Sequence, residues 1–236
     1  MHSALCLLRP EQIHVKEVLI MYTKLKDPGS AITHLIAMGG AVICAFPLLV
    51  KAVHSHNAIA VFAMAVFIGS MILLYAASSL YHSLDISAKI NLLFRRIDHA
   101  MIFVLIAGSY TPVCLLALPR SKGLPLLAFV WLVALAGIAL KIFIINCPHW
   151  ISSVMYIAMG WICILVFKPL VASLPPAAFG WLLAGGIIYT IGGILYGLKI
   201  PVFDRLPACF GSHEIFHLFV MGGSFCHFIF MYVYML

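Results

Sequence analysis

Long apolar segments separated by short polar ones dominate the chain. Each apolar segment is about twenty residues long, which is the length an α-helix needs to cross a hydrocarbon core of about 30 Å. The seven segments are Ala31–Val50, Ala58–Leu80, Ile97–Leu118, Leu124–Ile145, Trp150–Leu170, Ala177–Leu198 and Ile215–Leu236. The pattern predicts an all-α, polytopic membrane protein, with a cytoplasmic N-terminal segment over residues 1–30 and one bundle of seven transmembrane helices over residues 31–236.

The basic residues predict the orientation of this bundle. If the N-terminus is cytoplasmic, ten of the 14 Lys and Arg residues lie inside, namely Arg9, Lys16, Lys24, Lys26, Lys89, Arg95, Arg96, Lys141, Lys199 and Arg205. Four lie outside, namely Lys51, Arg120, Lys122 and Lys168. Cytoplasmic loops carry the excess of positive charge, so we expect the N-terminus inside and the C-terminus outside. Rhodopsin-type receptors have the opposite orientation.

Composition supports the membrane class and narrows the partners. Hydrophobic residues make up 64% of the chain and charged residues 9%, far from the balance of soluble domains. The formal charge of +7 resides in loops between predicted spans, so it indicates topology signals and contacts with anionic lipids rather than nucleic-acid binding. We expect a multi-pass protein of the cell membrane whose partners are membrane lipids, and a homo-oligomer is compatible with the sequence. The seven cysteines are dispersed and indicate packing.

A few ionisable residues lie where they are energetically expensive. Of the seven acidic residues, only Asp98 and Glu214 fall at the ends of predicted spans. Histidines also concentrate in or near the spans, namely His34, His82, His99, His213, His217 and His227. An isolated histidine at the end of a span is usually interfacial, and we expect this of His34, His99 and His227.

The alternation of the spans brings several of these residues to one depth. His82 ends the second span, Asp98 begins the third, and His213 and His217 begin the seventh, all on the predicted cytoplasmic side. His213 and His217 are four residues apart, so they share one helix face, as do Ser78 and His82. Three neutral imidazoles and a water form a usual catalytic zinc shell. The sequence therefore predicts a zinc site with His82, His213 and His217 as ligands.

Three further residues are candidates for catalysis. A bound zinc ion would lower the pKa of water to about 7, and the Asp98 carboxylate could hold or deprotonate that water. Ser78 lies one turn before His82. Glu214 is a secondary candidate, because residues 213–217 read H-E-x-x-H, the zinc-protease motif in which Glu is the base.

Each candidate also has a structural interpretation. Asp98 could pair with Arg95 or Arg96, and Glu214 could complement the dipole at the start of its helix. Ser78 could be a packing residue.

Taken together, these motifs resemble the hemolysin III family, within the progestin and adiponectin receptor superfamily, which is distantly related to alkaline ceramidases. The likeness rests on Ser78-x-x-x-His82, Asp98 after a basic pair, and His213-x-x-x-His217. It extends from Asp27 to Leu236 and includes Gly108–Pro112, Met159–Trp161 and Gly186–Tyr196. The resemblance implies seven helices, an inner N-terminus, zinc held by the three histidines, and Asp98 and Ser78 around the water.

One motif departs from the superfamily pattern. An acid-x-x-Asn-x-x-x-His sequence often enters the first span, and here Asp27 and His34 fit while Ser30 replaces the Asn.

Three functions are consistent with the sequence. The first is a zinc hydrolase acting on an amide or ester of a membrane lipid. The second is a non-enzymatic receptor or regulator of membrane composition in which zinc joins the second and seventh spans. The third is a cytolysin, as the family name suggests.

Overall fold

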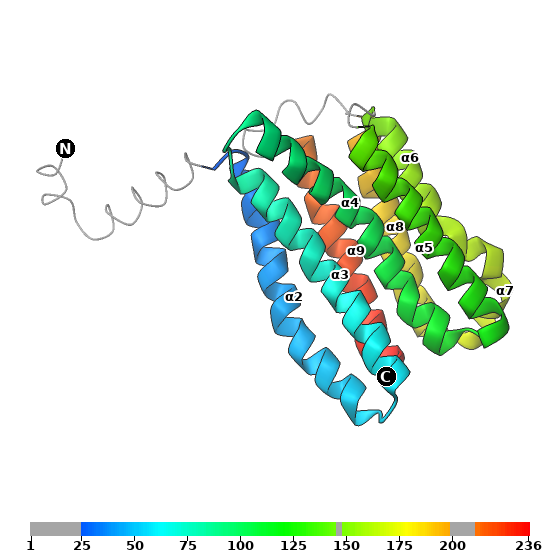
Figure 1. Ribbon diagram of the computed structural model, residues 1–236. Coiled ribbons are helices and arrows are strands. Elements are labelled where there is room, and N and C mark those ends of the chain that lie inside the picture. The colour runs from blue at the N-terminus through cyan, green and yellow to red at the C-terminus, as the bar shows by residue number, and fades with distance from the viewer. Residues whose placement is uncertain (1–24, 145–147, 199–210) are drawn as a thin grey trace, which may run out of the picture.

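Seven apolar helices, each long enough to cross a membrane, form the bundle (Figure 1). The computed structural model describes residues 25–144, 148–198 and 211–236. The helices are α2 (Pro28–His54), α3 (Ala58–Ser83), α4 (Ala88–Pro112), α5 (Arg120–Phe143), α6 (His149–Gly160), α7 (Phe167–Ser173), α8 (Pro176–Leu198) and α9 (Ser212–Tyr234). Helices α6 and α7 belong to a single span, His149–Ser173. The all-α, seven-span prediction is confirmed.

N-capping side chains and prolines mark where several helices begin. The side chain of Asn57 accepts hydrogen bonds from the backbone N–H groups of Ile59 and Ala60 at the start of α3. Ser87 does the same for Ile90 at the start of α4. Pro28 and Pro176 each occupy the first position of a helix, where a missing N–H leaves no hydrogen bond unmade.

Two membrane-length helices change their winding. After Pro112, α4 continues as a π-helical turn over Val113–Ala117, because proline supplies no N–H to the regular ladder. After Gly160, α6 tightens into a 3₁₀ segment over Trp161–Val166 before α7. The Tyr110 hydroxyl compensates for this break by donating to Gly160 O at 2.7 Å and accepting from Cys163 N at 2.9 Å.

The predicted span boundaries agree with the helices within a few residues, except at α4. This helix begins at Ala88, nine residues before the predicted start at Ile97. The added turns carry Lys89, Arg95 and Arg96, and a boundary placed from hydropathy excludes such charges. Their long side chains can reach the polar interface while their helix continues inward. Helix α2 also begins three residues early, at Pro28. Most of the predicted N-terminal segment, residues 1–24, lies outside the described residues.

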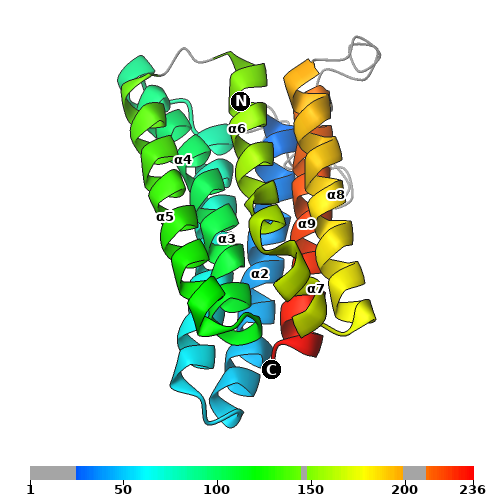
Figure 2. The ribbon, with the colours of Figure 1, turned by 90° about the vertical axis from the view of Figure 1, so that its right-hand side faces the viewer.

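The order of packing places α9 between α2 and α8 (Figures 1 and 2). Helices α2 to α5 pack as consecutive neighbours, whereas α8 packs against α6 and α9. Helices α2, α4, α6 and α9 begin at the same end of the bundle, where α3, α5 and α8 finish (Figure 2). This arrangement places the start of α2, the end of α3 and the starts of α4 and α9 at one end of the bundle. The sequence predicted this for α3, α4 and α9.

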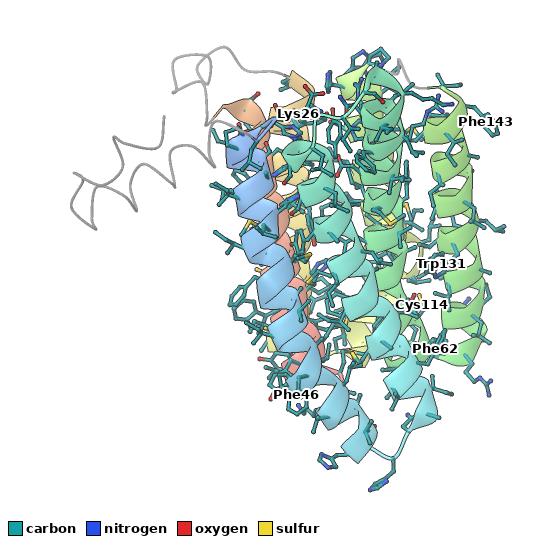
Figure 3. The ribbon with its side chains drawn as sticks, turned by 60° about the vertical axis from the view of Figure 1, so that its left-hand side comes forward. Lys26, Phe46, Phe62, Cys114, Trp131 and Phe143 are labelled. Atoms are coloured by element: carbon teal, nitrogen blue, oxygen red, sulfur yellow. The ribbon has the colours of Figure 1, made fainter. Side chains whose placement is uncertain are left out.

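Large apolar side chains cover the outside of the bundle. Phe46 is 76% exposed and Phe143 is 82% exposed, and Figure 3 shows both on the outer surface. An apolar surface of this extent is unfavourable in water but suits the hydrocarbon region of a bilayer. The chain is therefore a multi-pass membrane protein.

The orientation across the membrane leads to a first prediction. A reporter that is active only outside the cytoplasm should be active when fused after Leu236, because the distribution of basic residues predicts an outer C-terminus. The same reporter inserted between residues 199 and 211 should be inactive. Reporter activity measured in intact cells checks both fusions. The reverse pattern would contradict the predicted orientation.

Candidate metal centre

Three histidines from two helices converge at the end of the bundle where α2, α4 and α9 begin. His82 lies in the last turn of α3, and His213 and His217 lie in the first two turns of α9. Each can offer one ring nitrogen to a set in which all the nitrogens lie within 4.8 Å of one another. His82 and His217 are buried, and His213 is partly buried. The residues chosen from the sequence as ligands thus form a cluster that could hold a metal ion.

The distance between two of the rings is informative. The Nε2 atoms of His82 and His213 are 3.1 Å apart. Two imidazole nitrogens that share a zinc ion at 2.0–2.1 Å in tetrahedral geometry lie about 3.3 Å apart, so the observed separation fits a shared ion. It also fits a hydrogen bond from one ring to the other.

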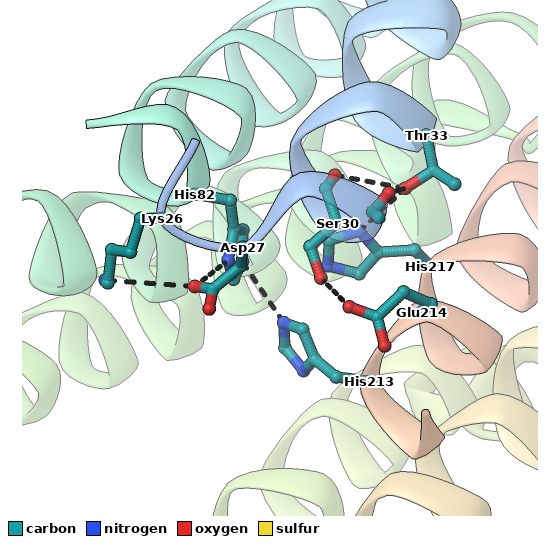
Figure 4. A network of polar contacts seen from close by, with 9 residues as sticks. Lys26, Asp27, Ser30, Thr33, His82, His213, Glu214 and His217 are labelled. Atoms are coloured by element: carbon teal, nitrogen blue, oxygen red, sulfur yellow. Dashed lines mark hydrogen bonds and ion pairs between the residues drawn. The ribbon is translucent and has the colours of Figure 1, made fainter. Parts of the chain in front are cut away.

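Hydrogen bonds on the far side of two rings fix which nitrogen faces the cluster (Figure 4). His82 Nδ1 lies 2.9 Å from the Asp27 carboxylate, which can only accept, so the proton is on Nδ1 and the lone pair on Nε2. The Thr33 hydroxyl is close to the carbonyl oxygens of Gly29 and Ser30, at 2.9 and 3.0 Å. It therefore donates to a carbonyl and accepts from His217 Nδ1, 3.3 Å away. Both arrangements are typical of histidines that bind metals.

Helix α2 thus contributes to a site whose ligands lie on α3 and α9. The N–H of Asp27 also donates to the carbonyl oxygen of His82 at 2.9 Å, which fixes the start of α2 against the end of α3. Asp27 was part of a recognised motif but was not among the predicted site residues. Its position at the entrance of the first span, at the same depth as His82, is the signal that could have identified it.

His34 and His227 are not interfacial, and that expectation was wrong. His34 is 3% exposed, and its ring stacks on His217 with centroids 3.6 Å apart. His227 is buried in α9, where its Nε2 donates to the carbonyl oxygen of Leu182 at 3.3 Å. Helix packing, which single positions do not reveal, turns both side chains inward.

Asp98 and Ser78 lie beside the cluster but outside the three-histidine set. Both are buried, and both line a cavity of about 280 Å³ together with His213 and His217. Within the described parts of the chain, the buried Ser78 hydroxyl has no hydrogen-bond partner. Among the described residues, Asp98 forms no ion pair with Arg95 or Arg96, so the structural interpretation of this carboxylate as half of a salt bridge is not observed.

Glu214 has a different environment. One carboxylate oxygen accepts from the Ser30 hydroxyl at 2.5 Å and the other from the backbone N–H of Gly211 at 2.7 Å. Such a pattern stabilises the start of α9 and ties it to α2. Ser30, which replaces the Asn of the superfamily pattern, is therefore a partner of Glu214.

The cavity extends from the cluster into the membrane-spanning part of the bundle. Apolar side chains of several helices dominate its lining, including Leu105, Ile106, Phe179 and Leu182. Trp161, the first residue of the 3₁₀ segment that follows α6, also lines the cavity. A long, apolar space that ends at a polar cluster matches the shape and chemistry of a lipid chain with a reactive polar group.

The contact between Asp27 and His82 leads to a second prediction. Asp27→Asn should weaken metal binding by about 10- to 100-fold, because the amide holds the His82 ring less firmly and lowers its basicity as a ligand. Competition with a chelator of known affinity measures this. Asp85→Asn is the matched control, since Asp85 accepts from Asn91 and touches none of the three histidines. Equal affinities for both variants would contradict the assigned role of Asp27.

Comparisons with known proteins agree with this architecture. Residues 22–228 match the family described as Haemolysin-III related. The chain is 40% identical to Hemolysin-3 of Bacillus cereus over 214 residues, which cover 89% of this chain and 92% of the relative. It is 38% identical to the Hemolysin-3 homolog of Bacillus subtilis (strain 168), with 86% and 92% covered. The adiponectin receptor protein of Drosophila melanogaster is 28% identical over 190 residues, covering 70% of this chain and 40% of that protein.

Proposed function

We propose that this chain, which belongs to the haemolysin-III-related family, is a zinc-dependent hydrolase that cleaves an amide or ester of a membrane lipid. The observation that carries the proposal is the position of the three-histidine cluster. It lies at the end of an apolar cavity that also contains a buried carboxylate, Asp98. The distant relation of the progestin and adiponectin receptor superfamily to alkaline ceramidases, which the sequence resemblance implies, favours an amide as the bond that is cleaved.

The histidines supply the donor set that zinc prefers. His82, His213 and His217 would hold the ion, and Asp27 and Thr33 would orient two of the rings. When bound, zinc would lower the pKa of a coordinated water to about 7 and polarise a carbonyl oxygen. Three protein ligands leave one coordination position open, as catalytic zinc sites require.

Asp98 is the residue best placed to handle the proton. Its carboxylate is buried and lines the cavity beside His213 and His217, so it can accept a proton from a water at the cluster. The same group can then donate that proton to the leaving amine or alcohol. Ser78 is buried and lines the same cavity, and its hydroxyl would be available to the water or the substrate.

The apolar cavity would hold the hydrocarbon chain of the substrate. Its volume of about 280 Å³ is near the lower end of small-molecule sites. Apolar walls bind a chain through the hydrophobic effect, and the polar end then positions the bond to be cleaved. Water excluded by the chain would strengthen the electrostatic contribution of Asp98.

A non-enzymatic role is the second candidate. The histidines join α3 to α9, and their partners add α2, so a bound ion would clamp three helices. The name of the Drosophila relative, adiponectin receptor protein, favours a receptor or regulator. A purely structural zinc usually has four protein ligands, and within the described residues the cluster contains three. The name Hemolysin-3 gives cytolysis as a third alternative.

Release of fatty acid tests the proposed reaction. The protein purified in lipid nanodiscs should release fatty acid from at least one member of a panel of ceramides, N-acyl amino acids and lysolipids. The release should stop when a chelator removes the metal and return with added zinc. No metal-dependent release from any of these lipids, at full zinc occupancy, would favour the receptor or regulator.

A further inference from the structure

A second, polar cavity of about 270 Å³ adjoins the three-histidine cluster at the same end of the bundle. It shares His99, Tyr196 and His213 with the apolar cavity, so these side chains separate the two spaces. An amphiphile bound at the cluster would therefore place its chain on one side of His213 and its head on the other. The polar lining then decides which heads can bind.

The two acids of the polar cavity already have partners. Glu214 accepts hydrogen bonds from Ser30 and Gly211. The Asp27 carboxylate lies 2.9 Å from His82 Nδ1 and 3.9 Å from Lys26 Nζ, so its charge is balanced by a lysine. Neither carboxylate is available to balance a further cation.

Arg95 contributes a cation to this cavity. Arg95 lines the space, and over the described parts of the chain its guanidinium has no hydrogen bond or ion pair. With Lys26 offsetting Asp27, the remaining fixed charges among the residues that line this cavity are those of Glu214 and Arg95, and Asp98 lines the adjoining cavity. A zinc ion at the histidines would make the cavity strongly positive. A positive cavity with an unpaired guanidinium favours an anion that accepts two parallel hydrogen bonds.

The register of α4 sets the distance between this anion and the reacting bond. Arg95 precedes His99 by four residues and Asp98 by three, so the three side chains share one face of the helix. Three residues, a rise of about 4.5 Å along the helix, separate the level of Arg95 from that of Asp98. An anionic group bound at Arg95 would thus lie only a few bonds from a carbonyl at the cluster.

We propose that Arg95 selects lipids whose head carries a carboxylate or phosphate a few bonds from the cleaved bond. This inference rests on the proposed function for the identity of the cleaved bond, but it concerns binding and can be tested without turnover. A carboxylate next to an amide, as in an N-acyl amino acid, satisfies the spacing. A phosphate on a short N-acyl amino alcohol satisfies it as well.

Binding of three lipids that share the same palmitoyl tail distinguishes a carboxylate head from a phosphate head. N-palmitoylglycine, N-palmitoylethanolamine phosphate and the neutral N-palmitoylethanolamine would be titrated against zinc-loaded protein in nanodiscs. At least one anionic lipid should bind more tightly than the neutral one. Arg95→Gln should weaken its binding by about 10- to 100-fold, the effect of a lost charge-assisted contact, and leave the neutral lipid unchanged. The anionic lipid that loses most affinity identifies the head.

Two controls make the result specific. Arg96→Gln removes the neighbouring charge, which lines neither cavity, and should change no affinity. His82→Ala should remove the metal yet retain a preference for the anionic lipid. If that preference survives Arg95→Gln and disappears with the metal, the anion binds at the metal and the inference is wrong. Equal effects of Arg95→Gln and Arg96→Gln would also overturn it, since they would indicate attraction to the membrane surface.

Discussion

Replacing any one of His82, His213 or His217 by alanine should remove most of the zinc from the purified protein. The three ring nitrogens lie within 4.8 Å of one another, and each would supply one of the three protein bonds to a bound ion. Loss of one ligand leaves two, too few for tight zinc binding at a buried site. Metal analysis of detergent-purified protein gives the zinc content directly.

His227→Ala is the matched control for this experiment. His227 is a buried histidine of the same helix, α9, and hydrogen-bonds to Leu182 rather than to the cluster. The variant should keep a full complement of zinc. Thermal unfolding of all four variants separates loss of a ligand from loss of the fold. Equal zinc contents in the four variants would contradict the assigned ligands.

Asp98→Asn should abolish turnover while leaving the metal in place. In the proposed site the three histidines would hold the ion without Asp98, so the zinc content should stay near that of the unchanged protein. The amide is nearly the same size as the carboxylate and keeps α4 packed, but it cannot take a proton. Loss of a general base typically lowers the rate by about 10²- to 10⁴-fold. Fatty-acid release from the best substrate of the lipid panel measures the effect.

The same variant distinguishes a catalyst from a structural clamp. If zinc only joins the helices, Asp98→Asn should leave zinc content, thermal stability and cellular phenotype near those of the unchanged protein. Glu214→Gln tests the protease-like alternative, in which Glu214 is the general base and this variant would show the large loss of turnover. Because Glu214 bonds to Ser30 and Gly211, we expect Glu214→Gln to affect stability more than turnover. Full activity in both variants would exclude a carboxylate-assisted mechanism.

The convergence of the three histidines could be predicted from the sequence because it depends on two regular features: the alternating direction of the spans and the spacing of residues along an α-helix. The alternation of seven spans fixes which ends share a side, and a spacing of four residues places His213 and His217 on one face. An apolar segment of membrane length has few structural alternatives, since in lipid only a helix forms all its backbone hydrogen bonds within the segment. The family, confirmed by the matched residues 22–228, could likewise be recognised from these motifs.

The partners of the histidines could not be predicted in the same way. Asp27 and Thr33 act on His82 and His217 through contacts between α2 and two distant helices. Those contacts depend on how α2 is rotated about its axis, which a nearly uniform apolar pattern leaves undetermined. The inward positions of His34 and His227 went unrecognised for the same reason. The two cavities depend on the packing of several helices at once.

Zinc K-edge X-ray absorption of the purified protein tests the central claim most directly. The claim is that three imidazoles hold one zinc ion and leave a position open. We expect about three nitrogen neighbours at 2.0–2.1 Å with the signature of imidazole rings, and an additional oxygen. His213→Ala should lose this signal. Protein that purifies without zinc, or a zinc spectrum dominated by sulfur at about 2.3 Å, would contradict the account.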